Sequence, residues 1–246
     1  MYNLNIIKIE KTDSTNNYAR ELIKSGNISE ITVIAADEQL SGKGHSENTW
    51  ESEKGKNLTF SAILSPHFLE IQNQFILTKV ISLAITDFVA EYFDKSLVKI
   101  KWPNDIYVND KKICGILIEN VVKSDLFEYS IVGIGININQ TEFISDAPNP
   151  TSLKIINGID YNLKELFYKL LKHIENRYAQ LINPILNTLD KEYLNALYKF
   201  RELIDYKFQQ KEIKAQIIGV SKFGKLIVKT EDEFLIECDF KEIEFL

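Results

Sequence analysis

The stretch "KWPNDIYVNDKKICGIL", from Lys101 to Leu117, lies between runs of apolar and β-branched residues that are typical of strands. Asn109 and Asp110 stand just before Lys111, and an Asn-Asp pair between two such runs is typical of a tight hairpin turn. The stretch therefore predicts two adjacent antiparallel strands and places an antiparallel sheet at the centre of the fold.

The first residues of the same stretch carry more polar groups than a hairpin needs. Trp102 and Pro103 stiffen the chain, while Lys101, Asn104 and Asp105 present charges and hydrogen-bonding groups close together. A rigid backbone that carries polar side chains indicates a functional site.

Length and charge restrict the class of protein. The chain has 246 residues, of which 45% are hydrophobic, so it can bury a substantial core as one large domain with at most one small companion. A net charge of −6 argues against nonspecific binding of nucleic acid, which depends on neutralising phosphates. Nothing precedes the first predicted strand, residues 4–9, that could form a helix-turn-helix, so no nucleic-acid partner is expected.

The sequence also argues against a membrane span, a disulfide and a metal site. The longest apolar region, residues 75–90, contains Lys79 and Asp87, and residues 1–11 lack a signal-peptide pattern. We therefore expect a cytoplasmic protein without a membrane partner. Cys114 and Cys238 lack a CxxC partner and are interpreted as small buried hydrophobic residues.

Periodicity predicts an α+β protein with a mixed, mostly antiparallel sheet and flanking helices. Helical spacing covers residues 14–23, 75–93, 163–181 and 186–200, with Pro184 between the last two, and strand patterns cover residues 31–36, 58–64, 98–100, 106–108, 112–121 and 128–138. From Lys207 onward the strands are short and closely spaced, which is typical of a small barrel. The predicted domains are residues 1–200 and 207–246.

A polar stretch between Asp37 and Lys56 has glycines, several lysines and one tryptophan, Trp50. A loop of this length in a compact domain is usually functional or disordered. Its backbone amides and Lys43 could wrap an anionic ligand, but the GxxxxGK[ST] spacing of a phosphate-binding loop is missing. A mobile surface loop remains the alternative.

Two further segments have both a structural and a functional interpretation. Ser14, Thr15 and Asn16 stand at a predicted helix start, where such residues are often only caps. Gly133 and Gly135 share one face of a predicted strand, which predicts a bare strip against which a flat ligand can lie. The alternative is close packing of a neighbouring element on the glycines.

Taken together, these segments describe a pocket on a sheet, and their order resembles a biotin protein ligase of the kind that lacks a DNA-binding domain. The resemblance spans essentially the whole chain, with a catalytic domain similar to class II synthetases and an SH3-like C-terminal domain. It is carried by Ser14-Thr15-Asn16, Gln39, Gly42-Lys43-Gly44, Trp50, Gly55-Lys56-Asn57-Leu58, the KWPND block, Lys112, Gly115-Ile116-Leu117 and Gly133-Ile134-Gly135-Ile136-Asn137.

The resemblance implies an activity. Members of this family join biotin to ATP, with Mg²⁺ accompanying the ATP, to form biotinyl-5′-AMP and pyrophosphate. They then transfer biotin to one lysine of the biotin carboxyl carrier domain of a carboxylase. No metal-binding residues of the chain itself are expected.

The resemblance also implies roles for individual residues. Catalysis is expected from Lys112, between the biotin carboxylate and the α-phosphate, with Lys101 on the phosphate side and Asp105 orienting the carrier lysine. Residues expected to bind biotin are Ser14, Thr15, Asn16, Gln39, Lys43, Gly44, His45, Lys112, Gly115, Gly133 and Gly135. Those expected to bind ATP are Lys43, Trp50, Asn104, Lys112 and Asn137.

The glycine loop departs from the family pattern. Glu47 replaces a glycine, and His45 and Ser46 stand where an arginine is often found. A carboxylate beside bound phosphates is unfavourable by ~1 kcal/mol if solvated. We therefore expect the loop to close less tightly over the adenylate than in typical members.

Two other functions remain open at this point. A lipoate or octanoate ligase or transferase would share the fold, although the KWPND block favours biotin. A sensor that binds biotin or a nucleotide without turnover would not need the cation of Lys112. The sequence does not identify the carboxylase carrier or the role of the C-terminal strands. Because family members often pair through sheet edges, a homodimer also stays open.

Overall fold

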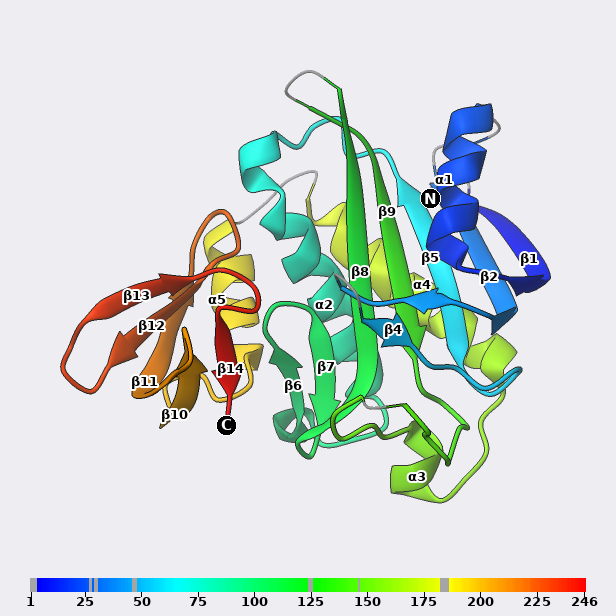
Figure 1. The fold of residues 1–246 in the computed structure, drawn as a ribbon. Coiled ribbons are helices and arrows are strands. Elements are labelled where there is room, and N and C mark those ends of the chain that lie inside the picture. The colour runs from blue at the N-terminus through cyan, green and yellow to red at the C-terminus, as the bar shows by residue number, and fades with distance from the viewer. Residues whose placement is uncertain are drawn as a thin grey trace.

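A mixed seven-stranded sheet carries the larger part of the chain (Figure 1). The computed structural model describes residues 4–26, 28, 31–45, 48–123, 126–145, 147–181 and 186–246. In spatial order the strands are β1 (Leu4–Thr12), β2 (Ile31–Gln39), β5 (Leu58–Leu64), β9 (Leu126–Ile136), β8 (Lys111–Lys123), β7 (Asp105–Val108) and β6 (Val98–Lys101). Only the β1–β2 pair is parallel. The predicted mixed, mostly antiparallel sheet is confirmed.

The predicted hairpin turn lies between β7 and β8. Val108 pairs with Lys111 across it, and the two turn residues, Asn109 and Asp110, have φ angles of 48° and 63°. This left-handed conformation suits Asn and Asp better than other residues with a Cβ atom. The connection from β6 to β7 contains the KWPND block, in which the Trp102–Pro103 peptide bond is cis.

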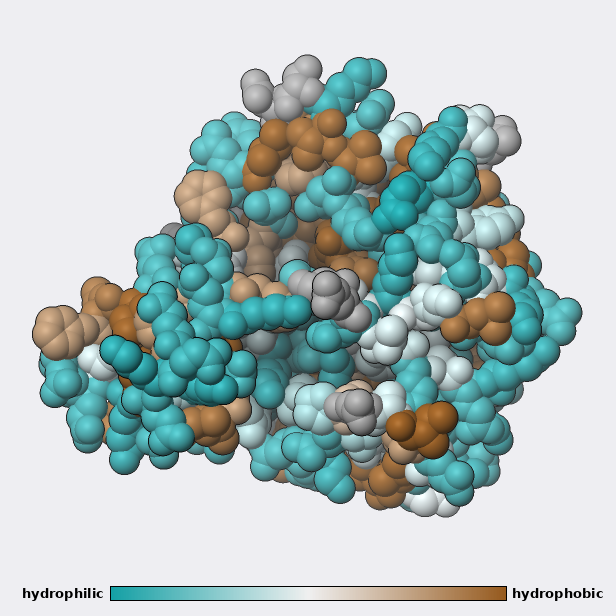
Figure 2. All heavy atoms as spheres, in the orientation of Figure 1, coloured by the Kyte–Doolittle hydropathy of each residue, from teal (hydrophilic) through white to brown (hydrophobic). Residues whose placement is uncertain are grey.

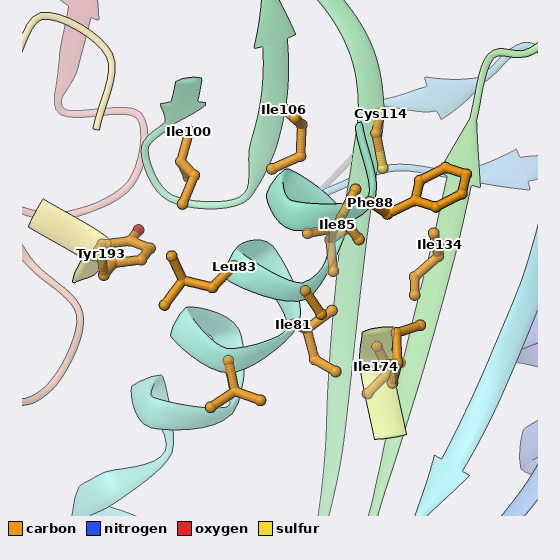
Figure 3. Packing of buried hydrophobic residues seen from close by; sticks show 14 of the residues in the cluster. Ile81, Leu83, Ile85, Phe88, Ile100, Ile106, Cys114, Ile134, Ile174 and Tyr193 are labelled. Carbon is orange, nitrogen blue, oxygen red and sulfur yellow. The ribbon is translucent and has the colours of Figure 1, made fainter. Parts of the chain in front are cut away.

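Helices cover both faces of the sheet. α2 (Phe75–Val89) and α4 (Leu163–Ala179) pack on one face, where α2 presents Ile81, Ile85 and Phe88 to the strands (Figure 3). α1 (Thr15–Ser25) packs on the other face through a separate small cluster that includes Ala19 and Ile34. Alternate residues of β2, β5 and β9 enter the two clusters, as the two-residue period of a strand requires.

A second, five-stranded antiparallel sheet follows. Its spatial order is β13 (Leu235–Cys238), β12 (Leu226–Thr230), β11 (Lys211–Val220), β10 (Leu203–Phe208) and β14 (Ile243–Phe245). The edge strands β13 and β14 do not pair with each other, so the sheet stays open and does not form the closed barrel that the short strands predict. The sheet begins at Leu203; the division into domains 1–200 and 207–246 stays a prediction.

The KWPND block joins the two sheets. The Trp102 indole N–H donates to the carbonyl of Gly224 at 2.9 Å, and the hydroxyl of Tyr193, in α5 (Leu186–Ala196), donates to the carbonyl of Pro103 at 2.9 Å. Tyr193 and Trp102 are both buried. The block therefore has fixed anchors on α5 and on the C-terminal sheet.

The remaining elements are short. The predicted loop between Asp37 and Lys56 contains a small hairpin, β3 (Gly42–Lys43) with β4 (Thr49–Trp50). A short helix, α3 (Leu153–Asn157), and two 3₁₀ turns, Ile71–Asn73 and Lys95–Leu97, complete the described elements. Pro184 lies outside the described residues.

Both cysteines are buried and unpaired, as predicted. In the part of the chain that the structure describes, none of the helices has the length and apolar character needed to cross a membrane. Figure 2 shows a largely hydrophilic face, with hydrophobic side chains gathered over the outer end of β8 and β9, where Val122 and Leu126 are exposed.

Gly224 provides a test of the junction between the sheets. Its φ is 89°, and a Cβ atom there would lie 2.4 Å from the Phe75 ring. Gly158 is a matched control, because its φ is 74° but no atom lies within 4 Å of an added Cβ. We expect Gly224→Ala to lower the free energy of unfolding by about 1–3 kcal/mol more than Gly158→Ala does. Chemical denaturation measures both, and equal losses would show that the Phe75 contact is unimportant.

Candidate active site

A cavity of about 300 Å³ opens on the face of the large sheet that also carries α1. It is bounded by the start of α1, the β3–β4 hairpin, the floor of β8 and β9, the KWPND block and the C-terminal sheet. Most residues predicted for the site line it: Ser14, Thr15, Asn16, Gln39, Lys43, Gly44, His45, Trp50, Lys101, Asn104, Asp105, Lys112, Gly115, Gly133 and Gly135. Segments far apart in the sequence therefore meet in one place.

The floor of the cavity is formed by glycines, and Trp50 covers two of them. Gly115 of β8 pairs directly with Gly135 of β9. A Cβ atom on Gly135 would lie 2.3 Å from the Trp50 indole, and one on Gly115 would lie 3.0 Å from it. The alternation predicts a bare strip of glycines, but Trp50 covers this part of it. Glycine is needed at these positions because the indole lies close against the sheet.

A glycine is also needed in the hairpin that carries Trp50. Gly42 pairs with Trp50 across β3 and β4, and a Cβ atom on Gly42 would lie 2.4 Å from the Trp50 carbonyl oxygen. On the other side of Trp50, the Glu51 carboxylate accepts the backbone N–H groups of Ile144 and Ser145. These bonds hold the pKa of Glu51 below its ordinary value, although burial opposes them. The indole is therefore anchored from both ends of its strand.

The end of the cavity next to α1 is polar and buried. Gln39 Oε1 accepts the backbone N–H of Thr15 at 2.9 Å and lies 3.1 Å from the Thr15 hydroxyl. Asn16 covers Gly133, where a Cβ atom would lie 2.3 Å from Asn16 Oδ1. Asn16 and Thr15 are each 3% exposed, so these polar groups serve the interior of the cavity as well as the helix start. Ser14 is the N-cap residue of α1 but makes no side-chain capping bond.

Cations lie at the centre of the cavity. Lys112 Nζ is 2.6 Å from Asp105 Oδ2 and 5.8 Å from the centre of the Trp50 ring. Lys101 Nζ lies 5.2 Å from the Tyr107 ring centre and 5.0 Å from that of Phe245. Burial lowers the pKa of Lys101, the nearby Lys112 adds to this, and Asp105 opposes it. Lys101 is thus a partly desolvated cation whose close neighbours are aromatic rings, which suits binding of an anion.

Two predicted ATP-side residues have different surroundings. Asn104 lines the cavity and donates from Nδ2 to the carbonyl of Ile116. Asn137 does not line it; it is 3% exposed and donates from Nδ2 to the Thr151 carbonyl at 2.9 Å. Asn137 Oδ1 and Thr151 Oγ1 are both buried and lack a hydrogen-bond partner. Unpaired polar atoms of this kind are costly unless a ligand or water pairs with them.

β14 and the turn before it supply cavity residues that sequence reasoning missed: Phe240, Lys241, Ile243, Glu244 and Phe245. The Phe240 ring centre lies 4.0 Å from that of His45. Burial and the positive charge of Lys241 lower the pKa of His45, and Asp105 opposes the shift. No motif in the sequence marks these residues. Ser46 and Glu47 lie outside the described residues, so the expected looseness of the loop stays a prediction.

His67 and His173 lie away from the cavity. The His67 ring contacts the carbonyl of Phe127, and His173 pairs with Glu91. Among the residues that the structure describes, no group of three His, Cys, Asp or Glu side chains is placed to hold a metal ion. In the cavity itself the carboxylates are those of Asp105 and Glu244.

Solved structures of other proteins share this fold over almost the whole chain. The biotin protein ligase from Aquifex aeolicus in complex with biotin and ATP is 28% identical, covers 98% of both chains and superposes with a TM-score of 0.79. The bifunctional ligase/repressor BirA of Bacillus spizizenii is 34% identical over 170 residues, which are 67% of this chain and 51% of that protein. The chain therefore spans about half the length of that relative.

A plant protein extends the similarity over more of the chain. Biotin–protein ligase 2 of Arabidopsis thaliana is 27% identical over 237 residues, which are 87% of this chain and 68% of that protein. The family model for biotin/lipoate A/B protein ligases matches residues 9–137, more than half of the chain. On this match, the chain belongs to the biotin/lipoate A/B protein ligase family.

Proposed function

We propose that this chain is an ATP-dependent ligase that forms biotinyl-5′-AMP and transfers biotin to a lysine of a biotin carboxyl carrier domain. The observation that carries the proposal is that one cavity brings Lys112 together with the polar pair Thr15 and Gln39 and with the cation of Lys101. A solved relative of the same fold is described in complex with biotin and ATP.

The two substrates fit opposite parts of the cavity. The ring urea of biotin has N–H donors and a carbonyl acceptor, which match Ser14, Thr15, Asn16 and Gln39. The adenine ring would lie toward Trp50, with the phosphates at Lys101, Asn104 and Lys43. The biotin carboxylate and the α-phosphate would then meet beside Lys112.

The first step needs a cation at that meeting point. A biotin carboxylate oxygen bonds to the α-phosphorus, the bond from phosphorus to the bridging oxygen breaks, and pyrophosphate leaves with the electron pair. Two anions about 4 Å apart repel by about 4 kcal/mol at a surface-like dielectric. The ammonium of Lys112, which Asp105 already holds at 2.6 Å, offsets this repulsion.

The second step uses the other side of the same ion pair. The amine of the carrier lysine bonds to the acyl carbon, the bond from that carbon to the phosphate oxygen breaks, AMP leaves with the electron pair, and the proton of the amine passes to solvent. Asp105 lines the cavity with its side chain 28% exposed, so it can orient the incoming amine by hydrogen bonding. The carboxylase that provides the carrier is not identified by any residue here.

Mg²⁺ is expected to enter with ATP. The carboxylates of Asp105 and Glu244 are too few for a complete protein site, which fits a metal bound mainly through phosphate oxygens and water. When bound, Mg²⁺ neutralises phosphate charge. Lys101 and Lys112 then carry the part of the charge stabilisation that the chain itself supplies.

The alternatives predict different substrate dependence. A lipoate or octanoate ligase would use a longer acyl chain, and a sensor would bind without turnover. Release of pyrophosphate from ATP that depends on biotin and not on lipoate, followed by a streptavidin blot with a carrier domain, supports the proposal. Lipoate dependence supports the first alternative, and biotin binding without pyrophosphate release supports the second.

Lys112→Ala should lower the rate of biotin-dependent pyrophosphate release at least about a hundredfold, because the cation between the two anions is lost. The matched control is Lys111→Ala, because Lys111 is the exposed neighbour in the same strand and is outside the cavity. We expect the control to keep the parent rate. Circular dichroism checks that both variants fold, and a folded Lys112→Ala variant with the parent rate contradicts the role of Lys112.

The depressed pKa of Lys101 predicts a dependence on alkaline pH. Lys101 loses its proton at a lower pH than an exposed lysine does, so the KM for ATP should begin to rise at a pH below the ordinary lysine pKa of about 10.4. In Lys101→Arg the guanidinium stays charged, so the rise should be smaller. Steady-state kinetics at saturating biotin measures both profiles. Parallel profiles would mean that Lys101 does not hold the phosphates through its charge.

A further inference from the structure

A short hydrogen-bonded chain runs from the biotin end of the cavity to a carboxylate behind it. The Thr15 and Ser61 hydroxyl oxygens are 2.7 Å apart, and Ser61 Oγ lies 2.6 Å from Asn16 Oδ1. Asn16 Nδ2 donates to Glu119 Oε2 at 2.8 Å. Thr15 and Asn16 line the cavity, whereas Ser61 and Glu119 do not. These hydrogen bonds therefore link cavity residues to groups outside the cavity.

Glu119 determines which way the Asn16 amide points. The carboxylate pairs with Arg20 at 2.5 Å and can only accept hydrogen bonds. The Asn16 amide nitrogen must therefore face Glu119, and its oxygen must face Ser61. Because Asn16 is 3% exposed, water cannot easily satisfy the opposite orientation.

The orientation of the Asn16 amide determines which hydroxyl donates in the hydrogen bonds of Ser61 and Thr15. Two oxygens 2.6 Å apart need a hydrogen between them, and Asn16 Oδ1 has none to give, so Ser61 donates to it. A hydroxyl has one hydrogen, so the 2.7 Å contact between Ser61 and Thr15 requires Thr15 to be the donor. The single Thr15 hydrogen then lies on the shorter, 2.7 Å contact with Ser61 and not on the longer, 3.1 Å contact with Gln39 Oε1, so Thr15 Oγ1 offers only lone pairs to the cavity.

We propose that Glu119 is a positioning residue for substrate recognition, which makes Thr15 and Gln39 a paired acceptor for an N–H donor of the substrate ring. The inference rests on the proposed function, in which that donor is a ureido N–H of biotin. Lipoate has no ring N–H, so this acceptor pair favours biotin over lipoate. Glu119 acts through Asn16 and Ser61 and does not touch the substrate.

Glu119→Gln should reverse the direction of these hydrogen bonds with little change in the shape of the side chain. The new amide gives its oxygen to Arg20 and turns its NH₂ group toward Asn16. Asn16 then presents its oxygen to residue 119 and its nitrogen to Ser61, so Ser61 donates to Thr15. Thr15 then donates to Gln39 Oε1, 3.1 Å away, and its hydrogen lies between the two oxygens that would otherwise accept the substrate N–H.

Calorimetric titration with biotin tests the reversal. We expect Glu119→Gln to raise the Kd for biotin and the KM for biotin about tenfold, which is the effect of one mismatched hydrogen bond. The kcat and the KM for ATP should stay near the parent values, because the Lys112 end is untouched. The matched control is Glu91→Gln, which removes a similarly exposed, ion-paired carboxylate (38% against 31%) remote from the cavity.

A double-mutant cycle separates positioning from a general structural role. Without the Ser61 hydroxyl, Thr15 is free to donate to Gln39 whatever Asn16 does. Glu119→Gln should therefore raise the Kd about tenfold in the parent but leave it unchanged in a Ser61→Ala background. A tenfold rise in both backgrounds, or no rise in the parent, overturns the proposal.

The remaining outcomes are also decisive. If Ser61→Ala does not fold, the comparison of Glu119→Gln with Glu91→Gln decides, and equal Kd values overturn the proposal. If the parent binds biotin but releases no pyrophosphate, the proposed function fails. The ratio of the Kd for biotin in Glu119→Gln to that in the parent still tests the role of Glu119. If the parent binds no biotin, both proposals fail.

Discussion

The pairing of Gly115 with Gly135 is the constraint on which the rest of the site depends. Because neither residue has a side chain, the Trp50 indole can lie against β8 and β9, where a single Cβ on Gly135 would come within 2.3 Å of it. The indole in turn lies 5.8 Å from the ammonium of Lys112. The glycine pair therefore sets the height of the aromatic surface and the cation above the sheet.

The charged groups are held by contacts from both sheets. Asp105 ends the KWPND block, whose Trp102 and Pro103 are fixed by Gly224 and Tyr193. Lys101, at the other end of the block, lies between rings from β7 and β14. A cation that is partly desolvated in this way is costly without an anion, so the binding energy of a phosphate can be realised there. The C-terminal sheet is in this sense a wall of the cavity.

Local sequence signals predicted the features that depend on local chemistry. The hairpin turn at Asn109 and Asp110 and the mixed sheet followed from turn residues and periodicity, and the cavity residues followed from resemblance and spacing. Contacts across the chain were not predictable in this way. Phe240 and Phe245 have no distinctive spacing, and alternation alone cannot show that Trp50 and Asn16 cover the glycines. The open C-terminal sheet depends on the pairing of its edge strands, which short strands do not determine.

The rate of biotin-dependent pyrophosphate release in a Gly135→Ala variant tests the central claim most directly. The matched control is Gly219→Ala, where an added Cβ meets only ordinary contact at 3.8 Å from Ile227. If the bare pairing of Gly115 and Gly135 positions Trp50 and Lys112, Gly135→Ala should lower the rate at least about tenfold while the protein stays folded, and the control should keep the parent rate. A folded Gly135→Ala variant that turns over at the parent rate would contradict the account.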